Sequence, residues 1–206
     1  MNVKTIVTTG CAALLSLGVV SQASAQAAAV THGPPLAGVC IFSAEGAIGT
    51  STVGKYVNTR MQQIVAQVNA ELNAEKTGID NDAKTLEGQR ASLDQATLQK
   101  RVNDLNTRAN NLQRKAQLRD REVSATEQKA VGRIATELEP LAQAAYQSKS
   151  CSLLLNGAAV TLANPAMDLT PQVITALNAK ITQFAFDRER LDQAAAGGQA
   201  APAAKK

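Results

Sequence analysis

The chain has 206 residues, of which 2% are aromatic and none is tryptophan, and its formal net charge is +4. So few large side chains exclude a large globular core, and much of the length is expected in elongated helices. The mild positive charge does not indicate a nucleic-acid-binding protein, although it allows weak contact with an anionic membrane surface.

Residues 1–25 have the pattern of a secretory signal peptide. Lys4 supplies the positive charge, residues 6–20 are largely apolar, and Ala23-Ser24-Ala25 matches an A-x-A cleavage site. The apolar stretch is too short and too weakly apolar for a membrane-spanning helix. We therefore expect export, cleavage near Ala25 and a flexible segment at residues 26–37.

Two cysteines follow the signal segment, and each begins an expected strand, Cys40 in VCIFS and Cys151 in CSLLLN. Export places them in a compartment where disulfides persist. Two interpretations are open: two small buried apolar residues, or a disulfide that ties the strands together at the base of the helices.

Residues 57–145 carry the apolar repeat of a helical hairpin. On the first arm, apolar residues recur every seven positions, at Leu72, Ile79, Leu86 and Leu93. The second arm steps by three and four residues from Leu98 to Ala116, and its stripe resumes at Val123 and runs to Ala145. This alternation predicts a coiled-coil seam between antiparallel arms. Residues 90–101 hold a short turn, where Ser92 or Asp94 is expected to cap the second helix.

Opposite charges divide between the two arms. Residues 71–94 hold six acidic and three basic side chains, whereas residues 100–121 hold seven basic and two acidic ones. Most of these charges are expected to flank the seam and fix the pairing of the arms. The basic side chains of the second arm are also candidate contacts for a bound client protein: Lys100, Arg101, Arg108, Arg114 and Lys115.

All aromatic residues flank the arms, within residues 38–56 and 146–191, and antiparallel arms bring these flanks together as one body. There, CSLLLN and AAVTLA are strand-like runs joined at Asn156-Gly157, a tight-turn pair that predicts a β-hairpin. VCIFS supplies a third strand. Thr170 and Pro171 are expected to begin a helix that covers the sheet, with Thr170 as its N-cap.

An open sheet of three short strands leaves unpaired edges, which proteins commonly remove by closure or by oligomerisation. The sheet is therefore expected to be an assembly platform. The apolar side chains that we expect to form its contacts are Ile41, Phe42, Leu153, Leu154, Leu155 and Val160.

No residue pattern indicates catalysis. The only histidine, His32, lies beside Pro34 and Pro35 in the segment expected to be flexible. The sequence has no CxxC, no HExxH and no glycine-rich phosphate loop. We therefore expect no enzyme activity, no cofactor and no metal site.

The sequence resembles, in order, the Skp/OmpH family of periplasmic outer-membrane-protein chaperones. The likeness is carried by VCIFSAEGAI, STVGKYVNTRM, CSLLLNGAAVTLA and DLTPQVITALN, between Gly38 and Leu191. It implies a mainly α fold, in which a long antiparallel coiled-coil hairpin projects from a small β-rich trimerisation core. It also implies an ATP-independent holdase of the periplasm, whose homotrimer binds unfolded outer-membrane proteins in a cavity between its arms.

A second class of function stays open on the residues alone, a structural or adaptor protein of the cell envelope whose hairpin docks another assembly. A docking hairpin needs a defined motif near its turn, whereas a holdase needs mildly amphipathic, unspecific inner faces. The turn shows no such motif, and the small Ala and Asn residues of the second arm favour a holdase. Residues 192–206 have the composition of a disordered tail.

Overall fold

The computed structural model describes residues 30–191, so the expected signal segment and the expected tail lie outside the described residues. Residues 30–37 contain no helix or strand. The chain separates into an N-terminal unit that ends at His32 and a second unit that begins at Gly33. Every element below belongs to the second unit.

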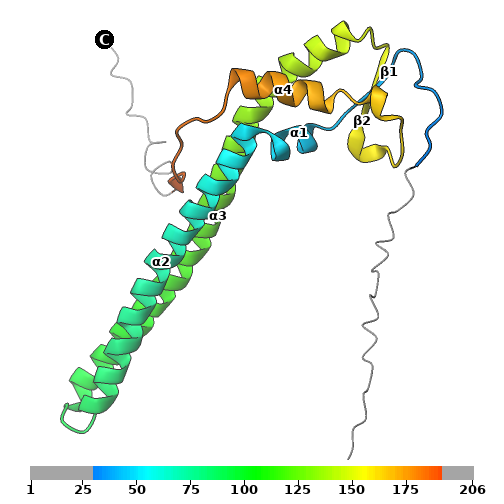
Figure 1. Ribbon diagram of the computed structural model, residues 1–206. Coiled ribbons are helices and arrows are strands. Elements are labelled where there is room, and N and C mark those ends of the chain that lie inside the picture. The colour runs from blue at the N-terminus through cyan, green and yellow to red at the C-terminus, as the bar shows by residue number, and fades with distance from the viewer. Residues whose placement is uncertain (1–29, 192–206) are drawn as a thin grey trace, which may run out of the picture. The chain divides into compact units, whose positions relative to one another are not determined.

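The second unit is mainly helical, with a small β region, as predicted. Its elements are β1 (Val39–Phe42), α1 (Ala44–Thr50), α2 (Thr52–Gln89), α3 (Gln95–Ser148), β2 (Leu153–Asn156) and α4 (Thr170–Lys180). Two 3₁₀ turns, η1 (Gly157–Ala159) and η2 (Pro165–Met167), connect β2 to α4. Helices α2 and α3 lie side by side as the two arms (Figure 1). No helix within residues 30–191 is both long enough and apolar enough to span a membrane.

The seam between the arms is made by small and medium apolar side chains. The buried residues of α2 include Val57, Met61, Ile64, Val68, Ile79 and Leu86, and those of α3 include Ala130, Ile134, Leu138, Ala142 and Ala145. The three-and-four spacing of these residues places them on one face of each helix. On α3 the buried stripe covers only the half nearer the body, because no residue from Gln95 to Arg121 is buried. The predicted seam from Leu98 to Ala116 is therefore half-buried at most.

The turn between the arms is capped by Asp94, whose Oδ1 accepts a hydrogen bond from Thr97 N at 2.9 Å. Ser92 does not cap α3, because its hydroxyl donates to Gln89 O at 2.8 Å and so closes the end of α2. Leu93, expected in the seam, lies in the turn because α2 ends at Gln89.

The corner between α1 and α2 sets the direction in which the arms leave the body. Ser51 is fully buried there, and its hydroxyl donates to Ile48 O at 2.9 Å and accepts from Gly54 N at 3.1 Å. A Cβ at Gly54 would lie 1.6 Å from Ile48 O, so only glycine allows this close approach.

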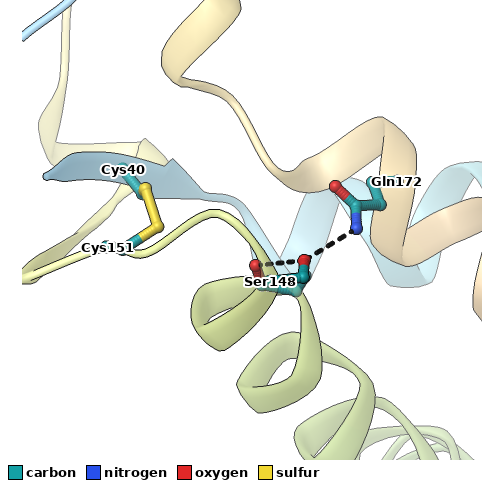
Figure 2. Close-up of a disulfide and its surroundings, with 5 residues drawn as sticks. Cys40, Ser148, Cys151 and Gln172 are labelled. Atoms are coloured by element: carbon teal, nitrogen blue, oxygen red, sulfur yellow. Dashed lines mark hydrogen bonds between the residues drawn. A yellow bond between two sulfur atoms is a disulfide. The ribbon is translucent and has the colours of Figure 1, made fainter. Parts of the chain in front are cut away.

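At the base of the arms, β1 and β2 pair in parallel, with Val39 opposite Leu153 and Phe42 opposite Asn156. A disulfide joins Cys40 to Cys151, with 5.9 Å between their Cα atoms. Figure 2 shows this bond beside the end of α3, where Ser148 Oγ accepts a hydrogen bond from Gln172 of α4 at 3.3 Å. The strands that precede and follow the arms are therefore joined both by pairing and by a covalent bond.

The predicted hairpin at Asn156-Gly157 is wrong, because β2 pairs with β1 and the run AAVTLA forms no strand. Asn156 Oδ1 instead accepts a hydrogen bond from Ala158 N at 3.0 Å, and Gly157 begins the turn η1. A local bond from an asparagine side chain to the backbone competes with strand pairing, and here it prevails. The place of a third strand is taken by a single bridge between Ile41 and Asp168.

Helix α4 begins at Thr170, one residue earlier than predicted, so Thr170 is not its N-cap. The Thr170 hydroxyl accepts a hydrogen bond from Ser43 N at 3.0 Å, which ties α4 to the end of β1. Asp168 Oδ1 accepts from Thr170 N at 2.8 Å and satisfies the first turn. Val173 and Leu177 of α4 are buried in the core of the body.

Replacing Cys40 and Cys151 by alanine should lower the free energy of unfolding by about 4–5 kcal/mol, because the disulfide closes a loop with a sequence separation of 111. Urea unfolding of the oxidised protein and of the double variant measures the difference. Peptide mapping without reductant should recover the two cysteines in one linked peptide. Equal stabilities, or separate alkylated peptides, would contradict this.

Candidate functional site

The outer edge of β2 is an apolar surface at the base of the arms. Leu153, Leu154 and Leu155 are 51%, 37% and 36% exposed. Within residues 30–191, β1 is the only strand that pairs with β2, so the other edge of β2 has no strand beside it. Three exposed leucines on an open strand edge are rare on a monomeric protein and are typical of an interface.

An apolar groove of about 640 Å³ adjoins this edge. Its walls come from four elements: β1, α1, α3 and β2. The large apolar side chains that line it are Phe42, Ile48, Leu138, Tyr146 and Leu154. Leu154 lines this groove, whereas Leu153 and Leu155, its neighbours along the strand, point to the other side. We call the groove, together with the three exposed leucines along the free edge of β2, the β2 face.

The six predicted oligomerisation residues do not all lie on the β2 face. Leu153, Leu154 and Leu155 are on it, and Phe42 is half-buried in its groove. Ile41 is only 7% exposed, because it lies inside the chain between β2 and Asp168. Val160 is half-buried in the loop after η1, beside a separate and more polar hollow.

Ion pairs between the arms occupy two of the five basic residues predicted to contact a client. Arg108 Nη1 lies 2.6 Å from Asp82 Oδ2. Lys115 Nζ lies 2.8 Å from Glu75 Oε2 and 2.9 Å from Glu71 Oε1, and these two carboxylates hold the pKa of Lys115 above its usual value. Their charges therefore serve the pairing of α2 with α3.

The other three predicted basic residues are exposed on the distal part of the arms. Arg101 donates to Gln89 Oε1 at 2.7 Å, across the turn. Arg114 donates to Asn111 on its own helix. With Lys100, these side chains remain accessible to a partner.

A buried ionic cluster lies further toward the body, and none of the sequence patterns predicted it. The carboxylate of Glu122, on α3, is fully buried and lies 2.9 Å from Arg119 Nη1. Arg119 also contacts both carboxylate oxygens of Glu71 on α2, at 3.0 and 3.2 Å. Arg188, from the segment after α4, lies 3.2 Å from Glu71 and 3.3 Å from Glu122. The cluster joins three segments that are far apart in the sequence.

The predicted stripe of the second arm passed through Val123, whereas the structure half-buries Val123 and buries Glu122 and Thr126. Glu122 and Thr126 precede Ala130 and Ile134 at intervals of four residues, so all four share one helix face. The spacing of these two polar residues is a signal in the sequence that polar groups of another segment cover this part of the seam.

The ionic cluster should make the free energy of unfolding depend on pH in the acidic range. Hydrogen bonds from Arg119, and then from Lys115, lower the pKa of Glu71 from 4.5 to about 2. The stabilisation from Glu71 is therefore complete above pH 4.5 and is lost as the pH falls toward 2.

Glu71→Gln should consequently destabilise the protein most above pH 4.5. Its loss in free energy of unfolding relative to the wild type should shrink as the pH falls toward 2. Urea unfolding at neutral pH and at steps through that range measures it. Glu127→Gln, at an exposed glutamate of α3, is the control and should show no such trend. A deficit that stays constant with pH would refute the role given to Glu71.

Lys115→Glu should lower the free energy of unfolding by about 1–2 kcal/mol, because it breaks two ion pairs and sets like charges together. Arg114→Glu, on the neighbouring residue and without an acidic partner in the described residues, should change it by less than about 0.5 kcal/mol. Thermal unfolding of the two variants compares them directly. Equal losses would show that the pairs between the arms do not stabilise the hairpin.

Residues 38–177 match the family model described as outer membrane protein (OmpH-like). The crystal structure of a candidate outer membrane chaperone (OmpH-like) from Caulobacter crescentus CB15 superimposes with a TM-score of 0.77. The two sequences are 52% identical, and the match covers 80% of this chain and 97% of that chain. No curated protein sequence matches.

Proposed function

Because this chain belongs to the OmpH-like outer membrane protein family, we propose that it is an outer membrane chaperone of the periplasm. In finer detail, it is an ATP-independent holdase whose homotrimer encloses unfolded outer-membrane proteins between its arms. The observation that carries this proposal is the combination of a long two-helix hairpin with an open apolar strand edge at its base.

The β2 face supports assembly through the body. Between residues 30 and 191, β2 pairs with a strand on one side only, and the exposed leucines beside its free edge gain from burial against other copies. Contacts at the base leave the arms free along their length. Helix α2 has 38 residues and extends about 57 Å at 1.5 Å per residue, so several arms enclose a space large enough for an unfolded chain.

The arms suit weak and unspecific binding. Their seam is made of small and medium apolar side chains, and no aromatic residue lies between Val57 and Ala145. Many of their charges already pair with each other, so each contact with a client is weak. Affinity then comes from several tethered arms that act on one client at a high effective concentration.

Leu154→Asp should convert the trimer into monomers, because a carboxylate on the β2 face would be buried without a partner in the assembly. Size-exclusion chromatography with light scattering gives the native mass. Val102→Asp is the matched control, since Val102 is equally exposed, at 37%, but lies far along α3. A wild-type protein that is monomeric at micromolar concentration would refute assembly through the β2 face.

The wild-type protein should suppress aggregation of a urea-unfolded outer-membrane β-barrel protein without added nucleotide, measured by light scattering after dilution. The Leu154→Asp monomer keeps intact arms, and it should lose most of this activity because the arms no longer act together. If the monomer holds clients as well as the wild type does, enclosure by several arms is wrong, and a docking surface on one hairpin becomes the better explanation.

A further inference from the structure

A C-terminal segment, residues 181–191, returns along the arms after α4 and contacts both of them. It begins four residues beyond the end of the family match at residue 177. Residues 182–190 contain no helix, and Ile181 has extended backbone angles, with φ −150° and ψ 131°. Figure 1 shows this segment running back from α4 toward α2 and α3. We call it the strap.

Side chains of the arms hold the backbone of the strap. Arg60 Nε of α2 donates to Phe186 O at 3.3 Å. On α3, Thr126 Oγ1 accepts from Glu189 N at 2.9 Å, and Glu122 Oε1 accepts from Leu191 N at 3.1 Å. Both α3 residues are buried. Bonds to main-chain atoms are available to any extended chain, whatever its sequence.

The strap also inserts aromatic side chains at alternate positions. Phe184 and Phe186 are half-buried against the core, with 5.4 Å between their ring centroids. Tyr56 of α2 meets Phe186 edge to face, with ring centroids 6.5 Å apart. Alternate residues of an extended chain point to the same side, and transmembrane β-strands carry apolar residues in this alternation. The contacts therefore select the pattern that an unfolded outer-membrane strand presents.

The arms can lose the strap without leaving an acidic residue unpaired. When Arg188 departs, Glu122 keeps Arg119 at 2.9 Å, and Glu71 keeps Arg119 and Lys115. Two other charges of the strap lie in ion pairs that each include an exposed partner, Asp187 with Arg60 and Glu189 with Lys129. Such ion pairs stabilise weakly and exchange readily.

We propose that the surface beneath the strap is a binding groove for extended client segments with aromatic residues at alternate positions, and that the strap is its intramolecular occupant. The groove consists of Tyr56, Arg60 and Ile64 of α2 with Glu122, Thr126 and Ala130 of α3. This inference deepens the holdase function and rests on it. Clients displace the strap by making the same main-chain bonds and inserting their own aromatic rings.

A labelled peptide with the strap sequence, Ile181 to Leu191, tests the groove by fluorescence anisotropy on the full chain. Phe184→Ser with Phe186→Ser loosens the strap and changes no arm residue. The loosened protein should bind the peptide at least about tenfold more tightly than the wild type, because an occupied site reduces apparent affinity by its free fraction. The matched control Gln183→Ser, at an exposed strap position, should bind like the wild type. A peptide in which both phenylalanines are serine should bind weakly to every variant.

Thr126→Val in the loosened protein should remove most of the gain, because valine cannot accept the main-chain N–H bond. Thr59→Val is the control, since Thr59 donates to Lys55 O of its own helix, as Thr126 donates to Glu122 O, but lies outside the groove. Circular dichroism confirms that each variant stays helical. Equal weak binding by folded wild-type and loosened proteins would overturn the proposal and leave the strap as a fixed brace.

Hydrogen exchange on the wild type tests displacement without any substitution. Adding an unfolded outer-membrane protein should speed exchange at the amides of Glu189 and Leu191, which the arms protect in the free chain. If the client binds while these amides keep their protection, the groove inference fails and the holdase function stands. If no client binds while the peptide still enters the loosened groove, the holdase function fails and the groove stands.

Discussion

The start of α2 and the end of α3 must lie together at the base of the arms, and the rest of the structure depends on how the chain joins them there. Strand β1 precedes the arms, β2 follows them, and the disulfide between Cys40 and Cys151 joins the two strands. A long helical crossover between two neighbouring strands permits parallel pairing, which is what the structure shows. With β1 placed between β2 and the Asp168 bridge, the free edge of β2 faces outward with its leucines. The surface proposed for assembly is therefore a consequence of the pairing of β1 with β2 at the base of the arms.

Ion pairs and hydrogen bonds to the backbone join the arms and the strap, a role that large apolar side chains have in many other proteins. The distal arms are joined by pairs such as Arg108 with Asp82, and the proximal arms by the cluster around Glu71 and Glu122. A hairpin built in this way has few free anchors for a folded partner. It suits the proposed holding of extended chains, and the aromatic rings packed on the proximal arms include Tyr56 of α2, Tyr146 of α3 and the two phenylalanines of the strap.

The arms were predictable from the sequence because their signal is local and repeated. Apolar residues at intervals of three and four fix both helices, and Asp94 caps α3 as one of two predicted candidates. The strand partner of β2 was not predictable in the same way. Asn156-Gly157 suits a hairpin turn. The structure differs because Asn156 Oδ1 accepts a hydrogen bond from Ala158 N and because β2 pairs with the distant strand β1.

The ionic cluster and the strap escaped prediction for a different reason. A glutamate on a charged helix usually faces solvent, and Glu122 is buried because Arg188, 66 positions later, lies against it. Long-range contacts of this kind depend on the path of the chain after α4. The spacing of Glu122 and Thr126 on the seam face is the one local clue to a covering segment.

Native mass spectrometry of the wild-type protein, alone and with a urea-unfolded outer-membrane β-barrel protein, tests the central claim most directly. Assembly through the β2 face with clients held between the arms predicts three copies of the chain alone, and the same three copies with one client after mixing. A single copy bound to the client, or three copies that never retain it, would contradict the claim.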